Sequence, residues 1–194
     1  MRQNKRIAIT GGIGSGKSVV LAACRELGYP VFSCDEIYAD LLGKPDFLAE
    51  LGATFPQCVK DGVLDRRALS RIAFSGEEEI KRLNAVTHPR IMERLLEEMN
   101  AFPLSFVEVP LLYEGGFEGL FDAVIAVYRS PEERIRAVRE RNGLSVEEIR
   151  LRIDRQFPQE ELRTRADFLI ENSGTANELK EKVRRIVDDL KDRF

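Results

Sequence analysis

The feature that most constrains the fold is a glycine-rich segment near the start of the chain, residues 11–18, with the sequence GGIGSGKS. It matches the pattern G-x-x-x-x-G-K-[S/T], which requires a strand before it and a helix after it. The apolar residues 6–10 are typical of a buried parallel strand, and residues 16–27 predict a helix that Gly28 and Pro30 end. Pattern and context therefore agree on a phosphate-binding loop, and we call residues 11–18 the phosphate loop.

The residue types of the phosphate loop suit a polyphosphate ligand. Glycines let the backbone approach the ligand closely, and amide groups together with the helix N-terminus form a nest for anions. Lys17 supplies a positive charge for the outer phosphates, and the Ser18 hydroxyl is placed to bind Mg²⁺. The expected ATP-binding residues of the loop are Gly12, Ile13, Gly14, Ser15, Gly16, Lys17 and Ser18. A glycine-rich turn that contains Lys-Ser by chance is the alternative, and it leaves the agreement of motif and context unexplained.

Four further apolar runs predict strands, at residues 31–34, 105–109, 123–128 and 168–170. Helical patterns separate them, which implies crossover connections between parallel strands. We therefore expect an α/β fold with a five-stranded, mainly parallel sheet flanked by helices. Residues 36–100 show helical patterns and no convincing strand, so they predict a helical insertion. A last helix from about residue 175 should pack on the sheet through one apolar stripe.

Composition excludes several classes of protein. The 194 residues contain 30 basic and 33 acidic side chains, a net charge of -3 that argues against a polybasic nucleic-acid or membrane binder. No apolar run approaches the ~20 residues of a membrane span. The three cysteines lack metal-site spacing and fit a reducing compartment, and the polar N-terminus leads into glycines without a signal-peptide core. We expect a cytoplasmic protein.

Arginine is concentrated between residues 129 and 165, where ten arginines and no lysine occur. Ser130 predicts a helix start, Asn142-Gly143 its end and Ser145 the next start, so we expect a helical hairpin that Pro158 ends. Planar guanidinium groups on a mobile segment can close over a transferred phosphoryl group, and we call residues 131–165 the lid segment. Ordinary solvated helices are the alternative, which we prefer for most of the ten arginines.

Within the first lid helix, Arg134 and Arg141 are predicted to lie near one face, with Ile135 and Val138 on the apolar side. No Asn-Lys-x-Asp motif follows the phosphate loop to read guanine, and the chain is short for a motor protein. These observations indicate a small phosphotransferase.

Three residues outside the phosphate loop are candidates for chemistry, each with a second interpretation. Asp35 follows the second predicted strand, where it could accept the proton of an acceptor hydroxyl or cap a helix, and the two roles are compatible. Glu108 interrupts the third strand and could act near Mg²⁺ through water or form an ion pair. For His88, the only histidine, packing or a hydrogen bond to the backbone is the preferred interpretation, and a ligand contact is the alternative.

Across nearly its whole length, the chain resembles the dephospho-coenzyme A kinase family. Single motifs are weak, but their order is specific. The motifs are residues 9–18 (ITGGIGSGKS), 34–37 (CDEI), 61–66 (DGVLDR), 87–91 (THPRI), 109–114 (VPLLYE), Arg141 with 143–145 (GLS), Gln156, 166–167 (AD) and 171–174 (ENSG).

The resemblance implies a kinase that transfers the γ-phosphate of ATP, with Mg²⁺, to the ribose 3′-hydroxyl of dephospho-CoA, the last step of coenzyme A synthesis. It implies a single kinase domain, with a core of about residues 1–35, 101–130 and 166–194, an acceptor-binding insertion over 36–100 and the lid segment. By the resemblance, the catalytic residues are Asp35 as the base, Lys17, which acts with Ser18 on phosphates and Mg²⁺, and Arg141 in the lid. Residues that would bind the acceptor or the adenine are Asp35, Arg66, His88, Pro89 and Leu111 for the acceptor, and Asn172 and Gly174 for the adenine.

The chain departs from the family pattern at a few positions. Ser33 and Glu108 each replace an aspartate, and Arg134, Ala137 and Leu162 replace a glutamine, an arginine and a lysine of the lid. Phosphate contacts are then expected to move to neighbours such as Arg134 or Arg163. The alternatives are a kinase for another nucleoside, nucleotide or small hydroxyl compound, and a nucleotide-binding regulatory module without catalysis. We expect small-molecule partners, no nucleic acid or membrane, and a monomer or small homo-oligomer.

Overall fold

The computed structural model describes residues 4–73 and 75–193. The chain divides into two compact units, one formed by Met1–Phe32 with Met99–Phe194 and the other by Ser33–Glu98. The phosphate loop, the sheet and the lid segment lie in the first unit. Most of the expected helical insertion makes up the second unit, which is contiguous in sequence.

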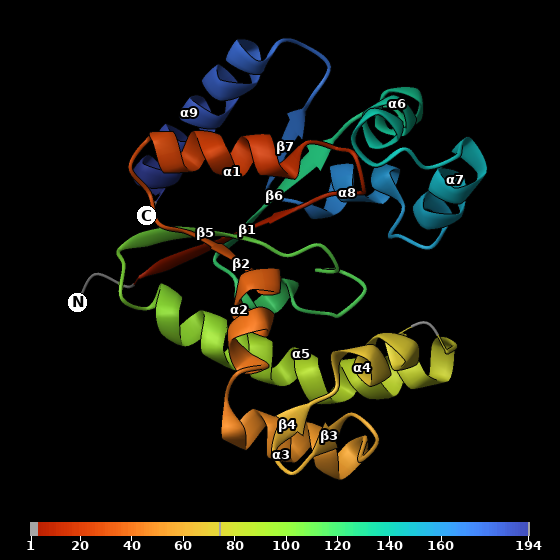
Figure 1. Ribbon diagram of the computed structural model, residues 1–194. Coiled ribbons are helices and arrows are strands. Elements are labelled where there is room, and N and C mark those ends of the chain that lie inside the picture. The colour runs from red at the N-terminus through yellow and green to blue at the C-terminus, as the bar shows by residue number, and fades with distance from the viewer. Residues whose placement is uncertain (1–3, 74, 194) are drawn as a thin grey trace. The chain divides into compact units, whose positions relative to one another are not determined.

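A five-stranded sheet forms the centre of the first unit (Figure 1). The strand order is β2-β5-β1-β6-β7, and the pairings β1–β5, β1–β6 and β6–β7 are parallel. The five predicted strands are confirmed. Their bounds are β1 Lys5–Thr10, β2 Val31–Ser33, β5 Leu104–Glu108, β6 Ala123–Tyr128 and β7 Phe168–Glu171. Because β1 lies in the middle of the sheet, the phosphate loop that follows it lies between the carboxyl ends of neighbouring strands, where parallel sheets bind ligands.

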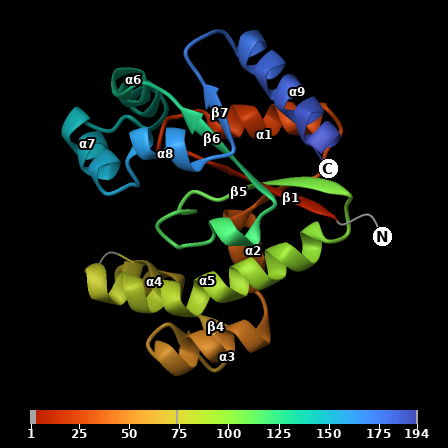
Figure 2. The ribbon, with the colours of Figure 1, turned by 180° about the vertical axis from the view of Figure 1, so that it is seen from behind.

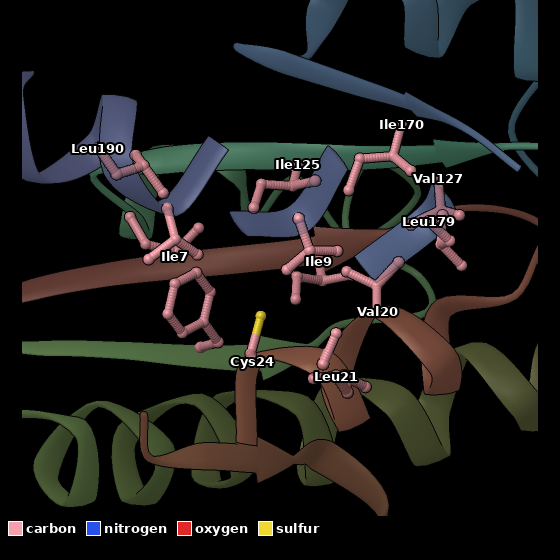
Figure 3. Close-up of a cluster of buried hydrophobic side chains, with 14 of the residues drawn as sticks. Ile7, Ile9, Val20, Leu21, Cys24, Ile125, Val127, Ile170, Leu179 and Leu190 are labelled. Carbon is pink, nitrogen blue, oxygen red and sulfur yellow. The ribbon is translucent and has the colours of Figure 1, made fainter. Parts of the chain in front are cut away.

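Helices α1 (Lys17–Glu26) and α9 (Ala176–Arg193) lie side by side against the sheet (Figure 1). Figure 3 shows their apolar side chains meeting those of the strands in one cluster. The predicted stripe of α9 is confirmed, because Leu179, Val183, Val187 and Leu190 are at most 3% exposed. Each fully buried aliphatic side chain of this kind stabilises the fold by roughly 1.5–3 kcal/mol. The cluster therefore fixes the start of α1 relative to β1, on either side of the phosphate loop.

The lid segment contains three helices, where two were predicted. They are α6 (Pro131–Asn142), α7 (Val146–Asp154) and α8 (Gln159–Arg165), grouped at one end of the sheet (Figure 2). The predicted starts of the first two are confirmed, since Ser130 accepts the Glu133 amide and Ser145 forms a capping box with Glu148. Pro158 is the N-cap of α8, so the fixed φ of proline begins a helix here instead of only ending one.

The second unit contains the helices α2 (Cys34–Leu41), α3 (Pro45–Thr54) and α4 (Arg66–Ala73) and most of α5 (Glu77–Met99). The prediction of no strand here is wrong, because β3 (Val59–Lys60) and β4 (Val63–Leu64) form a short antiparallel hairpin. Asp61 and Gly62 connect them with φ of 51° and 74°, the positive values of the favoured two-residue hairpin turn. Within the described ranges, no helix has the length and apolar character of a membrane span.

Candidate functional site

The phosphate loop joins β1 to α1 and leaves the start of the helix open. In the described part of the chain, no side chain caps α1, and its first turn holds no acidic residue. The N-terminal amides and the positive end of the helix dipole are therefore not neutralised by the protein. Ser18 is exposed in this first turn. The arrangement provides an anion site, as expected from the sequence.

Three glycines of the phosphate loop lie against close neighbours. A Cβ on Gly12 would lie 2.2 Å from the Arg134 guanidinium, and one on Gly16 would lie 2.2 Å from the Asn172 side-chain amide. At Gly14, where φ is +76°, a Cβ would lie 2.7 Å from the Arg134 carbonyl oxygen. Real Cβ atoms do not approach other atoms this closely. The glycines therefore bring the loop into contact with α6 and with the end of β7, in addition to giving the backbone its shape.

Lys17 is held at the base of the phosphate loop by oxygen atoms. Its Nζ donates to the carbonyl oxygens of Gly11 at 2.9 Å and Gly12 at 3.3 Å, and it lies 3.7 Å from Glu108 Oε1. Burial lowers the pKa of Lys17; Glu108 opposes this change, and the positive charges of Arg134 and Arg141 reinforce it. The ion-pair interpretation of Glu108 is thus confirmed, and its role near a metal stays a prediction.

The oxygen atoms at this site fit Mg²⁺. An exposed Ser18 hydroxyl and the Glu108 carboxylate are hard donors of the type that this ion prefers. Among the described residues, no group of three or more His, Cys, Asp or Glu side chains could hold a metal by itself. This is the usual situation for Mg²⁺ that is bound mainly by water and substrate phosphates.

Arg134 lies on the buried side of α6, against the phosphate loop. The prediction that Arg134 shares a face with Arg141, apart from the apolar side of Ile135 and Val138, is wrong. Arg134 is 3% exposed, like Val138 one turn later at 0%, whereas Arg141 is exposed. Its Nε donates to the carbonyl oxygen of Ile13 at 2.8 Å, and its Nη2 donates to Gln156 Oε1 at 3.1 Å. The same Gln156 oxygen accepts the amide of Ile13 at 2.8 Å. Burial lowers the pKa of the Arg134 guanidinium.

The remaining residues predicted in the first unit differ in their contacts and exposure. The side-chain amide of Asn172, directly after β7, donates to the Ser15 carbonyl oxygen at 2.8 Å. Arg141 is exposed at the end of α6 and donates to Asn142 at 2.8 Å. Gly174 is exposed before α9, and Leu111 is 40% exposed in the segment after β5. Asn172 therefore joins the phosphate loop itself, whereas Gly174 and Leu111 lie outside it.

The second unit holds the other predicted residues. Asp35 is exposed in the first turn of α2, and Ser33 is the N-cap, so the prediction that Asp35 caps this helix is wrong. Arg66 is exposed at the start of α4. His88 is half-buried in α5 beside the exposed Pro89, and burial lowers the pKa of its imidazole. The structure thus places these residues on three helices of one unit.

No local pattern predicts a role for Gln156 or the burial of Arg134. Gln156 appeared only as one residue in an ordered set of motifs. A spacing rule could not have found the contact, since the glutamine, the arginine and Ile13 are far apart in the chain. The only local signal is that Arg134 precedes the apolar Val138 by one helical turn.

Comparisons with known proteins agree with this geometry. The family model described as dephospho-CoA kinase matches residues 5–178. A dephospho-CoA kinase of Thermus thermophilus is 43% identical over 95% of this chain and 91% of its own length, and one of Geobacillus kaustophilus is 38% identical over 93% and 94%.

Solved structures extend the comparison to the fold. A crystal structure from Thermus thermophilus, 42% identical, matches with a TM-score of 0.82 over 97% of this chain and 98% of that one. A dephospho-CoA kinase from Campylobacter jejuni is 27% identical, with a TM-score of 0.64 over 96% and 97%. A shikimate kinase from Bacteroides thetaiotaomicron, 18% identical with a TM-score of 0.57 over 96% and 98%, shares the fold. The chain belongs to the dephospho-CoA kinase family and has the P-loop kinase fold.

Proposed function

We propose that this chain transfers the γ-phosphate of ATP to the ribose 3′-hydroxyl of dephospho-CoA, giving CoA and ADP. The observation that carries the proposal is the anion site at the start of α1, with Lys17 at its base, in a chain of this family. The acceptor oxygen bonds to the γ-phosphorus, and the bond from that phosphorus to the bridging oxygen of ADP breaks. The proton of the acceptor hydroxyl must go to a base. Catalysis then rests on positioning and on charge.

The phosphate loop would bind the triphosphate. Lys17 already lies beside the loop carbonyls, and it would exchange these acceptors for phosphate oxygens when ATP binds. Ser18 and Glu108 would hold Mg²⁺, directly and through water, and the ion would neutralise charge on the phosphates. Glu108 also opposes the effect of burial on the pKa of Lys17, because a carboxylate favours the charged lysine.

Asp35 is proposed as the base that receives the acceptor proton. The support is its place in the chain, two residues after the end of β2, together with its exposed carboxylate. Arg66, His88, Pro89 and Leu111 are proposed to border the acceptor, and Asn172 and Gly174 the adenine. Arg141 is proposed to act on the transferred phosphate, and its exposed guanidinium acts electrostatically on Lys17. We also propose that the protein is cytoplasmic.

A coupled assay of ADP release tests the reaction. The wild-type protein with ATP and Mg²⁺ should turn over dephospho-CoA and should be much slower with adenosine, AMP or shikimate. Turnover of one of these in place of dephospho-CoA would assign a different kinase. ATP binding without turnover of any acceptor would favour a regulatory module.

Two substitutions separate binding from chemistry. Asp35→Asn should leave ATP binding unchanged and lower kcat by about 10²-fold or more, the usual contribution of a general base. An unchanged kcat would remove Asp35 from this role. Lys17→Met should weaken both ATP binding and turnover. Lys44→Met is the matched control, because Lys44 is an exposed lysine that pairs with Asp40.

A further inference from the structure

One residue of the phosphate loop, Ile13, has both of its backbone polar atoms bound by side chains of the lid segment. Gln156 accepts its N–H at 2.8 Å, and Arg134 donates to its carbonyl oxygen at 2.8 Å. Gln156 and Arg134 are themselves joined at 3.1 Å. The three residues form a closed set of hydrogen bonds, and we call them the Ile13 clamp. The phosphate loop is thus held in place by residues that are more than 100 positions away in the sequence.

The chemistry of the Ile13 clamp is directional. Two donors, the Ile13 amide and the Arg134 guanidinium, meet at the same atom of Gln156, so that atom must be the amide oxygen. Arg134 uses two different nitrogens, Nε for Ile13 and Nη2 for Gln156. Only a planar fork presents two donors in this way, and a lysine ammonium at the same place could not reproduce both bonds.

Both side chains are held by contacts within the protein. The Arg134 guanidinium lies over Gly12, the backbone of Arg134 lies over Gly14, and the residue is 3% exposed. Gln156 is fixed through its neighbour Phe157, whose amide donates to Glu114 at 2.8 Å and whose ring lies 5.0 Å from that of Tyr113. Arg165 of α8 covers both rings, 4.7 Å from Tyr113 and 5.1 Å from Phe157. The clamp is therefore anchored at both ends.

We propose that Gln156 and Arg134 are positioning residues that hold the phosphate loop in its ATP-binding shape through the backbone of Ile13. This inference rests on the proposed function in taking ATP as the ligand of the loop. The Arg134 guanidinium donates to two neutral oxygens of the protein, the Ile13 carbonyl and Gln156 Oε1. Its proposed role is to fix the phosphate loop. The Ile13 amide is used by Gln156, and the other amides of the loop are then pre-oriented toward the triphosphate, which lowers the entropy lost on binding.

Kinetics with each substrate provide the test. Gln156→Met keeps the volume and removes the acceptor, and the loss of two hydrogen bonds should raise the KM for ATP roughly tenfold. The KM for dephospho-CoA and kcat should stay within about twofold, because the lid helices remain packed. Arg134→Lys should impair ATP binding as much as Arg134→Met does. Arg136→Lys is the control, because Arg136 is exposed on the same helix.

A second readout follows the clamp directly. The Ile13 amide should exchange slowly with solvent in the wild type and quickly in Gln156→Met, and Gln156→Glu, which keeps an acceptor oxygen, should restore slow exchange. An unchanged KM for ATP in Gln156→Met would overturn the proposal, as would Arg134→Lys with wild-type kinetics, which would assign only a charge to Arg134. A wild-type protein that does not phosphorylate dephospho-CoA would instead count against the proposed function.

Discussion

Replacing Gly14 with alanine should damage both stability and ATP binding, and the structure allows the two costs to be separated. The added Cβ would lie 2.7 Å from the Arg134 carbonyl oxygen and 2.9 Å from Val138 Cγ2. The first of these is backbone of α6, which cannot turn aside as a flexible side chain could. Either the phosphate loop or α6 must therefore move.

Gly143 provides the matched control. Both glycines have positive φ, +76° at Gly14 and +66° at Gly143, but a Cβ on Gly143 would have no atom within 4 Å. Gly143→Ala should therefore lower the free energy of unfolding only through the left-handed backbone conformation, by about 1–2 kcal/mol. Gly14→Ala adds crowding in a packed site, which costs about 1–3 kcal/mol more. For a chain of this length, the expected decreases in Tm are about 4 °C at Gly143 and about 9 °C at Gly14.

The assay must avoid tryptophan fluorescence, because the chain contains no tryptophan. Thermal unfolding followed by circular dichroism at the helical band gives Tm, and isothermal titration gives the Kd for ATP. Gly14→Ala should weaken ATP binding, whereas Gly143→Ala should leave it unchanged. Equal decreases in Tm for the two variants, or unchanged ATP binding in Gly14→Ala, would refute the argument that contact with α6 shapes the loop.

Three further predictions concern single groups elsewhere in the chain. Burial lowers the pKa of His88, so the unfolded chain binds a proton at this residue more readily than the folded one does. The free energy of unfolding should therefore fall as the pH drops below about 6.5. Urea unfolding at several pH values measures this loss, which His88→Gln should lack. Burial raises the pKa of Cys24 to about 12, so a thiol reagent at pH 8 should leave Cys24 unmodified in the folded protein, which mass spectrometry of the labelled peptides checks. Ser145→Ala removes the capping box of α7 and should lower stability by about 1 kcal/mol, measured as a lower urea midpoint, and an unchanged midpoint would contradict it.

The sequence predicted the parts of this molecule that depend on local patterns. The apolar runs of β1, β5 and β6 and the glycines of the phosphate loop carry their own signals, and so do Ser130 and Ser145 at the helix starts. The hairpin at Asp61-Gly62 was missed, although this pair is a strong signal for a two-residue turn, because its strands are only two residues long.

The Ile13 clamp and the pairing of Lys17 with Glu108 could not be derived from local patterns. A helix rich in arginine gives no periodic signal for which arginine is buried, since the acceptors that make burial possible come from other elements. For Arg134 these acceptors are a loop carbonyl and the side chain of Gln156. The partners of Arg134 and Lys17 therefore depend on the folded arrangement of distant segments. The family, by contrast, was indicated by the order of the sequence motifs.

The central place of β1 in the sheet has a consequence for how the chain folds. Lys5 pairs with Leu104 and Ile7 with Ala123, so β1 must wait for partners that lie about 100 residues later in the chain. The unit Ser33–Glu98, by contrast, is contiguous in sequence, so its contacts join residues that are closer along the chain. We expect the intervening helices to form early during synthesis and the nucleotide site late, because pairing strands distant in sequence carries the larger entropic cost.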